Sequence, residues 1–125
     1  MAGQVRNGTT KGIDENALAA YNAPFPDDDH KQGVRQFPNL VPGTPRTPSA
    51  EPNKEAWKIL REWDKPFLCA FSDKDPIFSG VENSFYKLIP GCKDMPHVTI
   101  QDAGHFLQED QPEACVDAIL SIKDI

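Results

Sequence analysis

Two side chains that could share a proton, those of Asp75 and His105, lie 30 positions apart. Each follows a short run of apolar or β-branched residues that predicts a strand, and catalytic groups of doubly wound sheets lie at the carboxyl ends of the strands. A carboxylate that accepts a hydrogen bond from one ring nitrogen of a histidine fixes its tautomer and leaves the other nitrogen free as a base. The spacing therefore predicts the acid and the base of a catalytic triad.

A second carboxylate, Asp73, lies in the same SDKDPI segment and has to be distinguished from Asp75. Asp75 is favoured because it precedes Pro76 and the apolar residues 77 and 78, surroundings that could exclude water and hold a carboxylate beside an imidazole. The alternative is that both are loop carboxylates bound to water or to backbone amides.

Histidine alone is an ambiguous indicator, because a single histidine is more often structural than catalytic. His105 lies between Gly104 and Phe106 on a turn after a strand. The other two are weaker candidates, since His30 lies in a proline-rich acidic loop and His97 at the start of a strand.

The third member of a triad, the nucleophile, requires a sharp strand-to-helix turn flanked by small residues. The chain contains no G-x-S-x-G motif, no aspartate or cysteine version of it, and no second glycine-rich turn upstream for an oxyanion hole. None of the following serines has the flanking glycines of that motif: Ser72, Ser79, Ser84 and Ser121. The sequence therefore predicts an acid and a base without the nucleophile they would serve.

The elements that would position Asp75 and His105 follow an α-β-α-β-α pattern, which is typical of a layered α/β fold. The apolar run 67–71 does not alternate, as expected of a strand buried on both faces of a parallel sheet. Gly104 permits a close approach that a side chain would block. The expected order is helix 53–63, strand 67–71, helix 81–89, strand 97–100 and helix 112–122.

The first part of the chain is less regular. Residues 1–12 are polar and without periodicity, so we expect a mobile start or a severed end, whereas 13–21 predicts one short helix. Seven prolines between residues 22 and 52 make long regular structure improbable. The large apolar side chains of the same segment predict that it packs on something.

Composition excludes several classes of function. A formal charge of −6 over 125 residues, with no basic run, argues against a nucleic-acid partner. No window approaches 18 consecutive apolar residues and the first residues lack the apolar core of a signal peptide, so we expect no membrane span and a cytoplasmic location. The three cysteines are 23 positions apart with no CxxC, which predicts reduced thiols and no metal site.

Three segments carry a family likeness: AAYNAPFPDDDHKQGVRQFPNLVP, KPFLCAFSDKDPI and IPGCKDMPHVTIQDAGHFLQED. Together they resemble the C-terminal part of haloalkane dehalogenases, within the α/β-hydrolase superfamily, from about Ile13 onward. A strand ending in DPI and an AGH turn recur across that superfamily. The first segment is more particular to the dehalogenases.

The resemblance implies hydrolysis of carbon–halogen bonds in two steps and without a cofactor. An aspartate nucleophile displaces the halide to form an alkyl ester, and a histidine-activated water hydrolyses that ester. By motif position, His105 resembles the base and Asp75 the acid. The implied fold is the C-terminal part of an α/β-hydrolase sheet at 53–125, preceded at 1–52 by the end of a helical cap and a proline-rich connection.

The resemblance also implies an apolar pocket for a small halogenated substrate, with water as the second reactant. Three residues match cap-side lining positions, and three more resemble lining beside the acid and base: Phe37, Pro38 and Val41, then Ile77, Phe78 and Phe106.

The nucleophile and the tryptophans that hold the halide belong upstream of Met1 by the same resemblance. Trp57 and Trp63 precede the acid strand and are interpreted as core residues. The resemblance thus predicts a missing N-terminal half as partner. Other interpretations remain: an epoxide hydrolase or esterase relative, or a catalytically inactive remnant that exposes one face of an incomplete sheet.

Overall fold

The computed structural model describes residues 2–122. Residue 1 of the expected unit 1–52 and residues 123–125 of the expected unit 53–125 therefore lie outside the described residues. Single turns of 3-10 helix (η) supplement the helices and strands. In chain order the elements are α1 (Ala2–Gly8), α2 (Glu15–Asn22), η1 (Asp29–Lys31), α3 (Gln32–Gln36), η2 (Phe37–Leu40), α4 (Ala50–Leu60), β1 (Ala70–Ser72), α5 (Glu82–Leu88), η3 (Pro90–Cys92), β2 (Val98–Ile100), α6 (Leu107–Asp110) and α7 (Pro112–Ser121).

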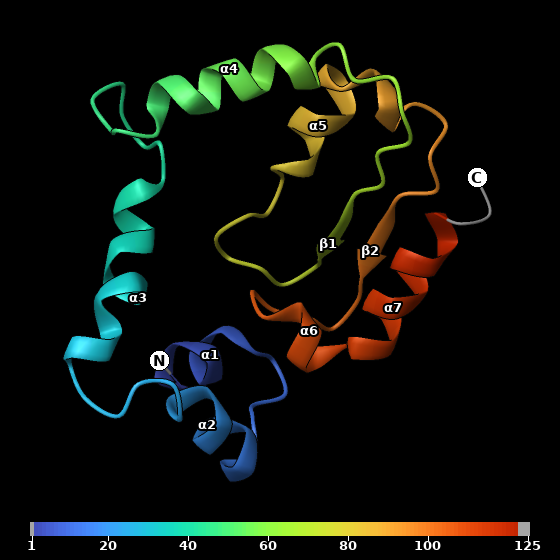
Figure 1. The fold of residues 1–125 in the computed structure, drawn as a ribbon. Coiled ribbons are helices and arrows are strands. Elements are labelled where there is room, and N and C mark those ends of the chain that lie inside the picture. The colour runs from blue at the N-terminus through green and yellow to red at the C-terminus, as the bar shows by residue number, and fades with distance from the viewer. Residues whose placement is uncertain (1, 123–125) are drawn as a thin grey trace.

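The elements are arranged as a ring around a central opening (Figure 1). In this view the α1 and α2 helices lie at the bottom beside α6, α3 forms the left side, α4 runs across the top, and the strands with α5 and α7 form the right side. The ring closes where the backbone N–H of Phe106 donates to the carbonyl of Gly8 at 3.2 Å. Segments about a hundred residues apart therefore meet next to His105.

The sheet has two strands among residues 2–122, and they are parallel. Ala70 pairs with Val98 and Ser72 with Ile100. Hydrogen bonding continues beyond the strands, because the N–H of Asp73 donates to the carbonyl of Ile100 and that of Lys74 to the carbonyl of Ala103. The α/β pattern predicted from residue 53 is thus present as a small parallel unit.

The strand expected at 67–71 begins three residues later and ends one residue later in the structure, as β1 at Ala70–Ser72. Phe67 does not join the ladder, because its N–H donates instead to the carbonyl of Gly91 at 2.9 Å. Gly91 has to be glycine here, since a β-carbon would lie 2.0 Å from the carbonyl oxygen of Lys65. The sheet is correspondingly short.

Each face of the sheet has its own core, as expected for a strand buried on both sides. Alternate side chains of a strand point to opposite faces. Cys69 accordingly packs with Ile89 and Cys92 under α4 and α5, while Ala70 packs with Ile100 and the Ala118 side of α7. The rings of Trp57 and Phe85 stack at 5.7 Å, which confirms Trp57 as a core residue.

The first residues of the chain are a correction to the sequence analysis. Residues 2–8 form the α1 helix, which packs against α2, and Val5 is completely buried. A single large apolar residue in a polar stretch shows no periodicity, so the sequence could not indicate this helix. The expectation of a mobile start was therefore wrong for the residues that the structure describes.

The helix expected at 53–63 begins and ends earlier, at Ala50–Leu60. Pro52 lies in the first turn of this helix. Backbone N–H groups in a first turn have no partner within the helix, so the N–H that proline lacks is not needed there. Ser49 is the N-cap, and its carbonyl accepts from the N–H of Asn53 at 2.9 Å. Trp63 lies beyond the helix end and is partly exposed.

The remaining helix expectations agree with the structure to within about two residues: 13–21 corresponds to α2, 81–89 to α5 and 112–122 to α7. The proline-rich segment contains only short helical pieces, as expected. The α6 helix, of four residues, was not predicted.

Replacing Val5 with Ala tests whether α1 belongs to the folded unit. The change removes two methyl groups from a fully buried site, so the free energy of unfolding should fall by about 2 kcal/mol. Val116→Ala, on the exposed side of α7, is the matched control and should cost less than about 0.5 kcal/mol. Equal urea-unfolding curves for the two variants would contradict the burial of α1.

Candidate functional site

Asp75 and His105 meet at the carboxyl end of the sheet. Nδ1 of His105 lies 3.0 Å from Oδ2 of Asp75, and the two side chains are 28% and 9% exposed. Asp75 follows β1 by three residues and His105 follows β2 by five, so the parallel register brings both loops to one edge. The structure thus joins the two residues that the sequence singled out.

The Asp75 carboxylate is held by backbone as well as by His105. Burial alone would raise its pKa, but the hydrogen bond from the Ile77 N–H, at 2.8 Å, and the one from His105 outweigh that effect. The pKa of Asp75 consequently lies below its usual value, and the group is a carboxylate at neutral pH.

A carboxylate at Asp75 determines the state of the histidine. Because a carboxylate can only accept, Nδ1 of His105 carries the hydrogen and donates it. Nε2 makes no hydrogen bond within residues 2–122, so it can act as a proton acceptor. This is the orientation in which a histidine serves as a general base.

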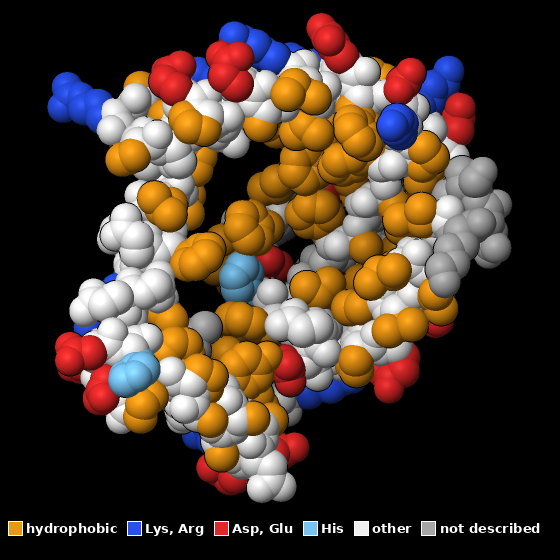
Figure 2. All heavy atoms as spheres, viewed as in Figure 1, with side chains coloured by type: hydrophobic (Ala, Val, Ile, Leu, Met, Phe, Trp, Pro, Cys, Tyr) orange, Lys and Arg blue, Asp and Glu red, His pale blue; other side chains and the backbone are white. Residues whose placement is uncertain are grey.

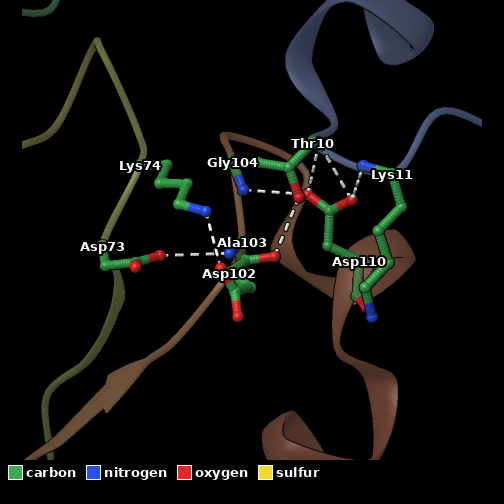
Figure 3. Close-up of polar contacts among 8 residues, drawn as sticks. All are labelled: Thr10, Lys11, Asp73, Lys74, Asp102, Ala103, Gly104 and Asp110. Carbon is green, nitrogen blue, oxygen red and sulfur yellow. Dashed lines mark hydrogen bonds and ion pairs between the residues drawn. The ribbon is translucent and has the colours of Figure 1, made fainter.

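Asp73, the competing carboxylate, has a structural contact instead. Its Oδ1 accepts from the N–H of Ala103 at 3.1 Å, which ties the loop after β1 to the turn after β2. Next to it, Nζ of Lys74 lies 2.6 Å from Oδ1 of Asp102, so the same two segments are joined twice (Figure 3). The preference for Asp75 over Asp73 as the partner of a histidine agrees with this geometry.

The other two histidines have different surroundings. Both ring nitrogens of His97 are engaged: Nδ1 accepts from the N–H of Cys69 at 3.1 Å, and Nε2 donates to the carbonyl of Cys92 at 2.9 Å. His30 is exposed and pairs with Asp27. Neither lies beside Asp75.

The expected lining residues fall into two groups. The rings of Phe78 and Phe106 lie 5.5 and 5.2 Å from the His105 ring, and Ile77 follows Asp75 but is largely exposed. Hydrophobic side chains border the opening in the ring of the molecule (Figure 2).

Phe37 and Pro38 line a groove of about 520 Å³ on the α3 side, together with Phe25 and Val34, but His105 is not among its lining residues. Val41 is exposed and does not line this groove. The structure therefore brings Phe78 and Phe106 to the acid and base, and leaves the cap-side residues apart.

Asp110 is a site residue that the sequence analysis missed. It is 1% exposed, and its carboxylate accepts from the backbone N–H groups of Gly104, Thr10 and Lys11 at 2.8 to 3.0 Å (Figure 3). Burial would raise the pKa of Asp110, but these hydrogen bonds together lower it. Two of the donors are about a hundred positions away, so local sequence gave no indication of them.

Within residues 2–122 no three His, Cys, Asp or Glu side chains gather in a way that could hold a metal ion. None of the helices in that range is both long and apolar enough to cross a bilayer. The cysteines are free, and burial, followed by the neighbouring Cys92, raises the pKa of the Cys69 thiol to about 12.

The lowered pKa values of Asp75 and Asp110 predict loss of stability in acid. The folded state favours both carboxylates, so their contribution is fully present above the unfolded-state pKa of about 3.9 and is lost as the pH falls through the lower folded-state values. Urea unfolding between about pH 6 and pH 2 should show this decrease, and Asp110→Asn should make it shallower. Asp117→Asn, on the exposed side of α7, is the control; an unchanged pH dependence in Asp110→Asn would contradict the prediction.

No protein-family model matches the chain. It is 49% identical over 113 residues to a haloalkane dehalogenase of Psychrobacter cryohalolentis, covering 90% of this chain and 37% of that protein. It is also 41% identical to a haloalkane dehalogenase of Mycolicibacterium paratuberculosis, over 91% of this chain and 38% of the relative, and 41% identical to haloalkane dehalogenase 1 of Mycobacterium tuberculosis, over 96% and 40%. The chain spans about two fifths of the length of these relatives. The resemblance inferred from the sequence is thereby confirmed, and the chain is a relative of the haloalkane dehalogenases.

Proposed function

We propose that this chain supplies the acid and the base for hydrolysis of carbon–halogen bonds in haloalkanes, through an alkyl-ester intermediate. The observation that carries the proposal is the hydrogen bond between His105 and Asp75 at the ends of adjacent parallel strands. It occurs in a chain related over nine tenths of its length to proteins named haloalkane dehalogenase.

In the first step a carboxylate nucleophile attacks the carbon that bears the halogen, and the halide leaves with the bonding electrons. The product is a neutral alkyl ester of that carboxylate. The chain has no turn suited to such a nucleophile, so we assign it to a complementary segment outside this sequence. Phe78 and Phe106 offer apolar contact to a substrate that has almost nothing to hydrogen-bond.

In the second step Nε2 of His105 removes a proton from a water molecule, whose oxygen attacks the ester carbonyl. The resulting imidazolium is stabilised by the Asp75 carboxylate 3.0 Å away. As the tetrahedral intermediate collapses, the imidazolium returns its proton to the leaving alkoxide and the alcohol is released. The carboxylic acid left behind loses its proton to solvent, which restores the carboxylate nucleophile. Over both steps one haloalkane and one water give one alcohol, one halide and one proton.

We further propose that residues 53–125 correspond to the C-terminal part of an α/β-hydrolase core and 1–52 to the end of a cap with its proline-rich connection. The parallel β1–β2 unit, covered by α5 on one face and α7 on the other, supports the first assignment. A cytoplasmic location belongs to the same proposal, supported by the free cysteines.

The complementary segment also has a surface to cover. Within residues 2–122 the sheet has two strands and the outer edge of each is unpaired, and such edges are prone to pair with a further segment of chain. Phe37, Val41, Ile77 and Phe78 are all exposed, and hydrophobic side chains gather around the ring opening (Figure 2). These features favour a partner half over an independent enzyme.

The proposal is tested by complementing this chain with the N-terminal three fifths of the Psychrobacter cryohalolentis relative and measuring bromide release from a brominated alkane. We expect turnover by the mixture or the fusion and none by the 125-residue chain alone. Turnover by the chain alone would contradict the assignment of the nucleophile to another segment. Turnover of an epoxide or an ester in place of the bromoalkane would favour the alternative hydrolases.

His105→Ala in the active mixture separates the two steps. Without the base, alkylation should proceed once and hydrolysis should stop, so bromide release should end at about one equivalent, with the alkyl ester visible by mass spectrometry. His30→Ala removes an exposed histidine away from Asp75 and should leave turnover unchanged. Full turnover by His105→Ala would exclude His105 from the mechanism.

A further inference from the structure

Residues 8–11, which we call the strap, cross the turn that carries His105. The carbonyl of Gly8 accepts from the N–H of Phe106, and the hydroxyl of Thr10 donates to the carbonyl of Asp102 at 2.8 Å. The approach is close, since a β-carbon on Gly104 would lie 2.4 Å from the carbonyl oxygen of Gly8. The strap therefore contacts the chain on both sides of His105.

Asp110 holds the strap and the turn together. Its carboxylate accepts from the N–H of Gly104 at 2.8 Å and from the N–H groups of Thr10 and Lys11 at 2.9 and 3.0 Å (Figure 3). Hydrogen bonds from backbone N–H groups to a buried carboxylate are among the stronger ones in proteins. One side chain thus connects two segments that are otherwise far apart in the sequence.

The consequence for His105 is that its backbone is fixed immediately before and immediately after the residue. Gly104 is bound to Asp110, and Phe106 is bound to Gly8. A displacement of about half an ångström would carry the 3.0 Å contact between His105 and Asp75 to the limit of a hydrogen bond.

We propose that Asp110 and the strap are positioning elements for the general base: they set the place of His105 so that Nδ1 meets Asp75, and they touch neither substrate nor nucleophile. The inference rests on the proposed function, because positioning has catalytic meaning only if His105 is the base. Its geometry, however, can be examined in the chain itself.

The experiment uses the 125-residue chain and ¹⁵N NMR of the His105 ring, with solvent exchange of the Nδ1–H proton as the readout. In Asp110→Asn an amide replaces one acceptor oxygen with an NH₂ group, which would face backbone N–H donors. We expect the Nδ1–H proton to exchange at least about tenfold faster, the equivalent of losing one charge-assisted hydrogen bond. Asp117→Asn makes the same chemical change on the exposed side of α7 and should leave the exchange rate unchanged.

A milder pair of variants covers the case in which Asp110→Asn fails to fold. Thr10→Val is nearly isosteric and removes the hydroxyl that bonds to Asp102, while Asp110 keeps its backbone donors. Thr44→Val is the matched control, because the exposed Thr44 bonds through its hydroxyl to Thr47 and Arg46, outside the strap. We expect a severalfold faster exchange of the His105 proton in Thr10→Val and an unchanged exchange rate in Thr44→Val.

The outcomes separate the two proposals. If Asp75→Asn changes the His105 ring signals but folded Asp110→Asn and Thr10→Val do not, the positioning inference is overturned and the acid–base pair stands. If Asp110→Asn does not fold, the Thr10→Val result alone decides. If Asp75→Asn leaves the His105 signals as in the original chain, the pair itself is absent, and both the proposed function and the positioning inference fail.

Discussion

The parallel pairing of β1 with β2 is the interaction on which the site depends. Three pairs of residues set the register, and two further backbone hydrogen bonds extend it to Lys74 and Ala103. Because parallel strands end at the same edge, Asp75 and His105 meet although 30 positions separate them. A slip of one residue would reverse the faces of the side chains and separate the pair. The geometry of the Asp75–His105 pair therefore depends on the register of the sheet.

Three aspartates near this edge show how one residue type serves different tasks. Asp75 faces an imidazole, Asp73 caps a backbone N–H of the neighbouring turn, and Asp110 binds three backbone N–H groups in a site that excludes water. Burial of a carboxylate is costly unless hydrogen bonds offset it. In Asp75 and Asp110 they do, since the pKa of each is lowered despite burial. The same bonds that stabilise the charges join the three segments.

What the sequence predicted and what it missed follow from the range of the interactions. The helices α2, α5 and α7 were indicated by helical periodicity, the two strands by short apolar or β-branched runs, and Asp75 and His105 by their places after strands. The α1 helix, the earlier start of α4 and the role of Asp110 depend on partners elsewhere in the chain, so no local pattern revealed them. The cap-side residues Phe37 and Val41 were named from family likeness alone; Phe37 lines a groove that does not include His105, and Val41 is exposed.

The structure describes Asp75 and His105 as one interacting unit in the folded chain. A double-mutant cycle with Asp75→Asn, His105→Gln and the double variant measures this directly, with the free energy of unfolding from urea titrations at pH 7. The structure predicts a coupling energy of about 1 kcal/mol or more, within the range found for residues in one hydrogen-bonded network. Strictly additive effects of the two substitutions would show that the two residues do not interact in the folded chain.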